Sequence, residues 1–134
     1  MTLAPIAFTA AQIVAHLFGD YILQSDAMAT LKTKASLWCA LHAVTYALPF
    51  LLLTRSPVAL AVIIGTHFVI DRWRLARFVV WAKNAAGGSY YPWAECSATG
   101  YQKDRPVWLA TWLLILVDNT MHLCFNALAL SWWP

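Results

Sequence analysis

The sequence predicts an all-α, polytopic membrane protein: a bundle of four transmembrane helices with one long cytoplasmic loop. Composition is the first reason, because 61% of the 134 residues are hydrophobic and only 11% are charged, against about 25% charged in a typical soluble domain. The second is the presence of four apolar segments of nearly the length that crosses a hydrocarbon core of about 30 Å. The third is that all four histidines and three of the five aspartates lie inside these segments.

A single transmembrane domain, residues 1–134, is expected to contain all four helices. They are placed at residues 6–23, 37–53, 57–81 and 107–130, and the loop at residues 84–105. The net charge of +3 is small, so no nucleic-acid partner is expected. The three cysteines lack a C-x-x-C spacing, which argues against a disulfide framework.

The first apolar segment carries a polar stripe. His16, Asp20 and Gln24 recur at every fourth residue, so on an α-helix they lie on one face. Gln24 would either orient a ligand side chain or act as an ordinary residue at the membrane interface. No basic residue precedes the segment, so we interpret it as a retained helix and not as a signal peptide.

The second segment contains His42 and, one turn later, Tyr46. Tyr46 would either hydrogen-bond to His42 or pack beside it. Only residues 54–56 separate this segment from the third, where Ser56 is a suitable N-cap and Pro57 a suitable first helical residue. So short a turn predicts an antiparallel helical hairpin.

The third segment places His67 and Asp71 one turn apart and then becomes basic, with arginines mixed among aromatic residues. This mixture is typical of a membrane interface, where long basic side chains extend toward water. Alternatively, these arginines and a lysine of the first loop would hold an anionic lipid head group or a phosphate. The residues concerned are Lys32, Arg72, Arg74 and Arg77.

The loop at residues 84–105 is long for so small a protein, and we expect it to act as a lid. The fourth segment has Asp118 and His122 four residues apart in its apolar middle, with Asn119 and Asn126 on either side of His122. An aspartate at a bilayer centre costs about 2.5–3.5 kcal/mol, so each buried aspartate is expected to have a compensating partner.

The spacing of His and Asp indicates a shared metal site. Three of the four histidines have an aspartate four residues away, which random placement would give on the order of once in several hundred sequences. Mixed nitrogen and oxygen ligands without cysteine suit one or two divalent ions, zinc first, with manganese or iron as alternatives. Polar packing and a proton path remain the other interpretations. The predicted ligands are His16, Asp20, His42, His67, Asp71, Asp118 and His122, supported by Gln24, Tyr46, Asn119 and Asn126.

The distribution of basic residues predicts the orientation. Four spans would place both termini and Arg55 on one side, and the other eight Lys and Arg residues on the opposite side. The positive-inside rule makes that second side cytoplasmic. We therefore expect a protein of the bacterial (host) inner membrane, with both termini in the periplasm and the metal site near the cytoplasmic leaflet.

With these residues in view, the chain resembles a small integral-membrane family of phages and bacteria, domain of unknown function 3307. The likeness covers nearly the whole chain and rests on HLFGDYILQSDAMATLK, the isolated His42, THFVIDRWRLARFVVWAKN and GYQKDRPVWLATWLLILVDNTMHLCFNA. More distantly, the His and Asp layout is similar to membrane-bound predicted metal-dependent hydrolases and to helical zinc phospholipases C. Those soluble phospholipases have further His and Glu ligands that this chain lacks.

The resemblance and the predicted site together suggest a metal-dependent hydrolase that acts on a phosphoester or lipid head group. Two other classes remain open: a non-enzymatic, phage-type membrane effector with a structural metal, and an ion or proton transport element. Membrane lipids are the expected partners, and a homo-oligomer is compatible with the sequence.

Overall fold

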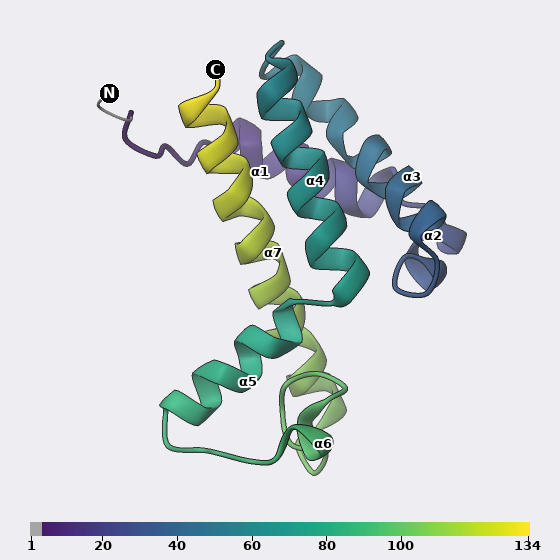
Figure 1. Ribbon diagram of the computed structural model, residues 1–134, viewed down its shortest axis with the longest axis vertical. Coiled ribbons are helices and arrows are strands. Elements are labelled where there is room, and N and C mark those ends of the chain that lie inside the picture. The colour runs from purple at the N-terminus through teal and green to yellow at the C-terminus, as the bar shows by residue number, and fades with distance from the viewer. Residues whose placement is uncertain (1–3) are drawn as a thin grey trace. The chain divides into compact units, whose positions relative to one another are not determined.

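A computed structural model of the protein describes residues 4–134, and every regular element in that range is a helix (Figure 1). The chain divides into two compact units. One comprises the residues up to Trp73 together with His122–Pro134, and the other comprises Arg74–Met121. The all-α class is therefore confirmed for the described residues.

The first unit begins with α1 (Ala10–Leu17), which continues directly into a π-helical turn, η1 (Phe18–Ile22). The helix begins four residues later than predicted because Thr9 is the N-cap, its side chain accepting from the Gln12 backbone N–H at 3.2 Å. The π-turn is closed by the Leu23 N–H, which donates to the Phe18 carbonyl at 3.0 Å. Together these elements cover residues 10–22, about 20 Å of helix.

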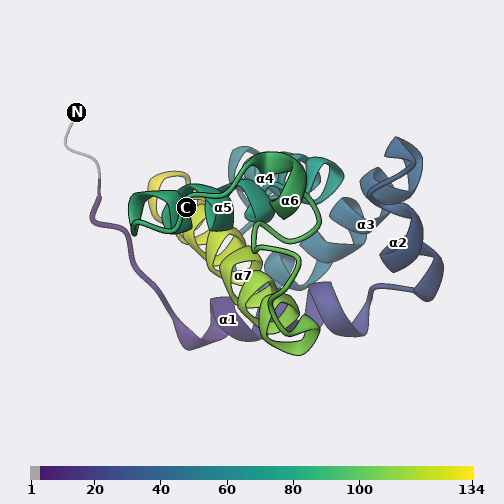
Figure 2. The same cartoon turned by 90° about the horizontal axis from the view of Figure 1, so that it is seen from below.

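The next elements are α2 (Asp26–Leu31), α3 (Ser36–Ala47), the 3-10 helix η2 (Leu48–Leu52) and α4 (Pro57–Trp73). Here α3 and α4 form the predicted hairpin, and α2 packs beside α3 (Figures 1 and 2). Ser56 accepts from the Ala59 N–H at 3.4 Å, and Pro57 is the first residue of α4 as expected.

The predicted single helix over 57–81 is interrupted, because α4 ends at Trp73. Arg74 adopts a left-handed backbone with φ of 51°, which a right-handed helix does not accommodate. The chain then restarts as α5 (Ala76–Ala86). The loop predicted at 84–105 is correspondingly shorter and contains a helical turn, α6 (Trp93–Cys96).

The second unit holds α5, α6 and the first part of α7 (Val107–Trp132). Its loop packs on α5: the Phe78 and Trp93 rings stack at 4.6 Å, and Trp81 Nε1 donates to the Tyr91 carbonyl at 2.9 Å. Gly100 lies so close to α5 that a side chain there would meet the Arg77 carbonyl. Burial raises the pKa of the Cys96 thiol, so this cysteine is a packing residue.

Helix length does not support the expected bundle of four membrane spans. A span needs about 20 residues, whereas residues 36–52 and α4 have 17 residues each. Among the described residues, α7 is the one helix long and apolar enough to cross a membrane. Within this helix, 22% of the most apolar 18-residue stretch is buried, and a single helix of this kind is weak evidence for a membrane span.

Small side chains form much of the core of the first unit. Tyr46, Phe50 and Ile63 are fully buried there against alanines of several helices. The segment before α1 and the end of α7 meet in this unit, where the Ala7 N–H donates to Ser131 Oγ at 3.0 Å. Thr9, Pro134 and Arg55 of the α3–α4 turn line one hollow.

Gly19 is where α1–η1 approaches α3 most closely, and Gly19→Ala should destabilise the protein by about 1–3 kcal/mol. An added Cβ would lie 2.5 Å from the Tyr46 carbonyl oxygen and 2.9 Å from Tyr46 Cδ2. Gly65→Ala on α4 is the matched control, because a Cβ there meets nothing within 4 Å. Denaturant unfolding should show Gly65→Ala neutral or about 0.5–1 kcal/mol more stable. Equal stability of the two variants would contradict the close approach at Gly19.

Candidate metal centre

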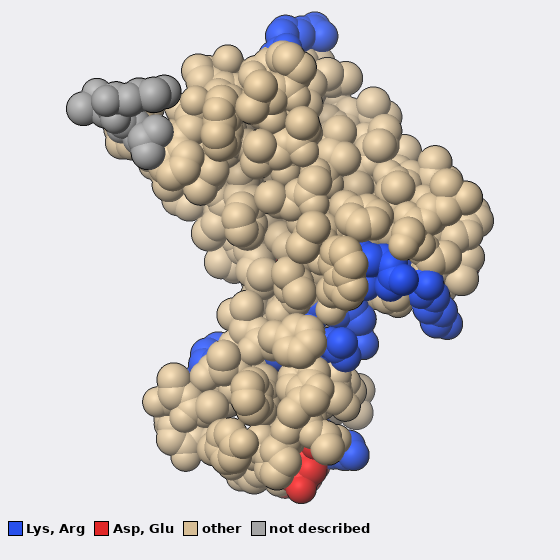
Figure 3. All heavy atoms as spheres, in the orientation of Figure 1, with Lys and Arg blue, Asp and Glu red and all other residues tan. Residues whose placement is uncertain are grey.

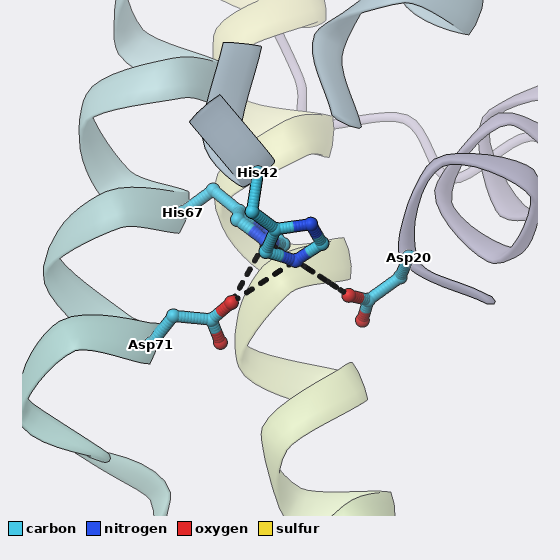
Figure 4. Close-up of side chains that lie close together, drawn as sticks. All are labelled: Asp20, His42, His67 and Asp71. Carbon is cyan, nitrogen blue, oxygen red and sulfur yellow. Dashed lines mark hydrogen bonds and ion pairs between the residues drawn. The ribbon is translucent and has the colours of Figure 1, made fainter. Parts of the chain in front are cut away.

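Four side chains from three helical elements of the first unit point at one another (Figure 4). Asp20 comes from the π-turn η1, His42 from α3, and His67 and Asp71 from successive turns of α4. All four are buried, with at most 4% of each residue exposed. Their ligand atoms lie within 4.8 Å of one another.

The spacing of these atoms fits a metal ion. His42 Nε2 lies 3.0 Å from His67 Nε2, 3.2 Å from Asp20 Oδ1 and 3.2 Å from Asp71 Oδ2. His67 Nε2 lies 3.1 Å from Asp71 Oδ2 and 3.9 Å from Asp20 Oδ1. A tetrahedral ion with bonds of about 2.0–2.1 Å has ligand edges of about 3.3–3.4 Å. The observed edges scatter around that value.

Hydrogen bonds through shared protons do not satisfy all the polar atoms of this cluster. A single proton can lie between the Nε2 atoms of His42 and His67, yet both atoms also face carboxylate oxygens. Two buried carboxylates close to one another need positive charge nearby. Within the described part of the chain, Nδ1 of His42 and Nδ1 of His67 have no hydrogen-bond partner. A cation bound to both Nε2 lone pairs would require each ring proton to lie on Nδ1, the nitrogen that has no contact within the cluster.

Asp71 is the centre of the arrangement. Its Oδ2 faces His42 and His67, while its Oδ1 lies 3.5 Å from His122 Nε2, on the C-terminal half of α7. The His67 and His122 rings stack at 4.1 Å. His122 therefore adds a third imidazole beside the group and contacts the second oxygen of the same carboxylate.

His16 lies outside this group. Its Nδ1 is 2.9 Å from the Tyr46 hydroxyl, which also accepts from Asn126 Nδ2 at 2.6 Å. The Tyr46 ring stacks on His67 with centroids 3.7 Å apart. Of the two expected relations to His42, packing is observed, since the Tyr46 and His42 ring centroids lie 6.4 Å apart, while the Tyr46 hydroxyl contacts His16 and Asn126.

The two His and Asp pairs lie on different kinds of helix. On a regular α-helix, residues four apart lie on one face, and His67 and Asp71 on α4 do so, with Nε2 and Oδ2 at 3.1 Å. Between His16 and Asp20 the helix changes to i→i+5 bonding, and Asp20, on this π-turn, directs Oδ1 to His42 Nε2 at 3.2 Å. Single π-turns inside helices are frequent at functional sites.

The four basic residues predicted to bind an anion do not share one site. Lys32, the C-cap of α2, directs Nζ to Asp71 Oδ2 at 2.9 Å. Arg72 donates to the carbonyls of Thr33 and Lys34. In the second unit, Arg74 and Arg77 donate to loop carbonyls at Ala98 and Ser97. Only Lys32 among the four reaches the His and Asp cluster of the first unit.

The remaining predicted residues are less closely defined. Gln24 is half-buried, and among the described residues its Oε1 has no hydrogen-bond partner. Asp118 and Asn119 are half-buried on the part of α7 that belongs to the second unit. Their proposed roles stay predictions.

Sequence reasoning missed Gln12, which is buried on α1 and donates from Nε2 to the Leu123 carbonyl at 2.9 Å. A signal was present, since Gln12 precedes His16 by four residues and extends the same polar stripe.

The fold and the site define a small all-α protein with a buried cluster of two histidines and two aspartates that could hold a metal ion. The chain belongs to the family described as "Protein of unknown function (DUF3307)", whose model matches residues 8–132. This match confirms the family that the sequence resembles. No curated protein and no solved structure matches the chain.

Proposed function

We propose that this protein is a membrane-embedded metalloprotein whose metal centre hydrolyses a phosphoester or a lipid head group. The observation that carries the proposal is the convergence of Asp20, His42, His67 and Asp71 with edges close to those of a tetrahedral ion. His122 would be a further ligand, because its Nε2 lies 3.5 Å from Asp71 Oδ1.

The donor set favours zinc, with manganese or iron as alternatives. Two imidazole nitrogens and two carboxylate oxygens are common ligands of all three metals, and the absence of cysteine removes any preference for a thiolate-seeking ion. A metal bound in this way lowers the pKa of a coordinated water and polarises a phosphoryl oxygen. Lys32 beside the cluster adds the positive charge that an anionic substrate requires.

Exposed apolar side chains support insertion into a membrane. Large hydrophobic residues are more than 60% exposed on several elements of the chain: Phe8, Val14, Ile22, Leu37, Leu52, Val107, Trp108 and Trp112. Soluble monomers rarely expose extended apolar surface. On the face shown in Figure 3, Lys and Arg gather in a few places, with broad uncharged areas between them.

The basic residues and the fold of the first unit favour one orientation. Arg55 lines the same hollow as Thr9 and Pro134, while the other eight Lys and Arg residues lie elsewhere in the sequence. We propose a bacterial inner-membrane location with the termini on the periplasmic side. Helix α7 provides a span, and the shorter helices would cross incompletely or tilt little.

A second candidate function is a non-enzymatic membrane effector with a structural metal. The burial of the four ligands favours it, because their side chains are at most 5% exposed. Structural zinc sites are closed by four protein ligands, whereas catalytic sites keep one position for water. The effector would thus hold the metal without turnover.

Metal analysis of the detergent-purified protein separates these functions. Elemental mass spectrometry should find about one or two equivalents of zinc, manganese or iron. The loaded protein should then release phosphate from p-nitrophenyl phosphate or from vesicles of anionic phospholipid, and His67→Ala should abolish both metal and release. Bound metal without hydrolysis would assign the effector function, and metal-free wild type would refute both.

A further inference from the structure

Lys32 is the one Lys or Arg side chain that contacts the His and Asp cluster among the described residues of the first unit. Its Nζ lies 2.9 Å from Asp71 Oδ2, 3.4 Å from His42 Nε2 and 3.9 Å from Asp20 Oδ1. Each of these three atoms is also a candidate metal ligand. The lysine ammonium therefore points toward the centre of the cluster, where these ligand atoms converge. Of the lysine side chain, 17% is exposed.

A metal ion and this ammonium group compete for the same electron pairs. An ion bonded to Asp71 Oδ2 at about 2.0–2.1 Å would be at most about 5 Å from Lys32 Nζ, which is 2.9 Å from that oxygen. Two positive charges at such a distance repel strongly in a buried place. Each carboxylate oxygen can therefore bind either the ammonium group or the metal ion.

The backbone around Lys32 is held independently of its side chain. Arg72, the residue after Asp71, donates to the Thr33 carbonyl at 2.7 Å and to Ser36 Oγ at 3.2 Å. Helix α2, which Lys32 caps, contains no buried residue. Because 17% of the Lys32 side chain is already exposed, it can turn toward solvent while the α2–α3 connection keeps its place.

We propose that Lys32 is a tethered competitor for the metal: its ammonium group offsets part of the negative charge of Asp71 and Asp20 until a divalent ion displaces it. This inference rests on the proposed metal centre and adds its regulation. While no metal is bound, the lysine offsets part of the charge of two buried carboxylates. It also sets a threshold concentration of metal, below which the ion does not displace the ammonium group. Once displaced, the ammonium group lies at the rim of the site, where an anionic substrate would arrive.

The test compares Lys32→Met with Lys34→Met. Lys34 is exposed and lies in the same connection, so its replacement makes the same change in net charge without removing the competitor. Competition titration with a chromophoric zinc chelator should show that Lys32→Met binds zinc at least about tenfold more tightly than wild type. Without added zinc its Tm should fall, and zinc should raise that Tm by more than it raises the Tm of wild type. Lys34→Met should match wild type in each measurement.

Labelling of the wild-type protein gives a second readout that needs no variant. Zinc should increase the rate at which an amine-reactive ester modifies Lys32, read by peptide mass spectrometry, while the rate at Lys34 stays constant. Unchanged or weaker zinc binding in Lys32→Met, or a constant labelling rate at Lys32, would overturn the competitor role alone. Absence of zinc binding in wild type would instead overturn the metal centre itself.

Discussion

The Asp71→Asn variant is expected to lose stoichiometric metal and about 3–5 kcal/mol of folding stability. One carboxylate serves three positive or ligating groups through Oδ2, namely Lys32 at 2.9 Å, His67 at 3.1 Å and His42 at 3.2 Å. Its second oxygen faces His122 at 3.5 Å. Asparagine keeps the size but removes the charge and presents an N–H₂ group to one of these sides, so the partly buried Lys32 ammonium loses its nearest counter-charge.

Asp104→Asn is the matched control, because the Asp104 side chain is 67% exposed, and surface substitutions of this kind usually change stability by about 0.5 kcal/mol or less. Elemental mass spectrometry and denaturant unfolding should be run on both variants beside wild type. Full metal occupancy in Asp71→Asn would exclude this carboxylate as a ligand and leave polar packing as the explanation of the cluster.

The Leu116→Arg variant is expected to insert poorly into the membrane, with a cost of about 2.5–3.5 kcal/mol. Leu116 is 57% exposed and lies toward the middle of α7, the helix that is long and apolar enough to span. If α7 crosses the bilayer, an arginine at this depth either lies in the hydrocarbon core or must extend its side chain to an interface. Membrane-fraction abundance after alkaline carbonate extraction reports the effect.

Val107→Arg provides the comparison on the same helix. Val107 is 81% exposed but is the first residue of α7, where an arginine side chain can reach the interface at little cost. In water both substitutions would be nearly neutral, because both positions are exposed. Equal abundance of Leu116→Arg and Val107→Arg would therefore argue against a span through α7.

The sequence by itself determined the helical class and the family, because apolar residues at helical spacing and specific His and Asp motifs are local features. It also predicted the α3–α4 hairpin, since Ser56 and Pro57 begin α4 through contacts within a few residues. The pairing of His67 with Asp71 belongs to the same group, because a regular helix places residues four apart on one face.

Tertiary structure decided which of the predicted ligands meet. Asp20 contacts His42 of α3 from the π-turn η1, and that turn forms where Gly19 packs against the Tyr46 backbone. The left-handed residue at Arg74, which ends α4, also has no local signal, since arginine has no preference for positive φ.

The role of Lys32 shows the same limit most clearly. The sequence placed it in a polar loop and suggested anion binding, whereas the fold brings its Nζ to Asp71, 39 residues further along the chain, at 2.9 Å. Contacts between residues so distant depend on how α2, α3 and α4 pack. Helical periodicity specifies which face of each helix is polar, but the packing of those faces chooses the partner of each charge.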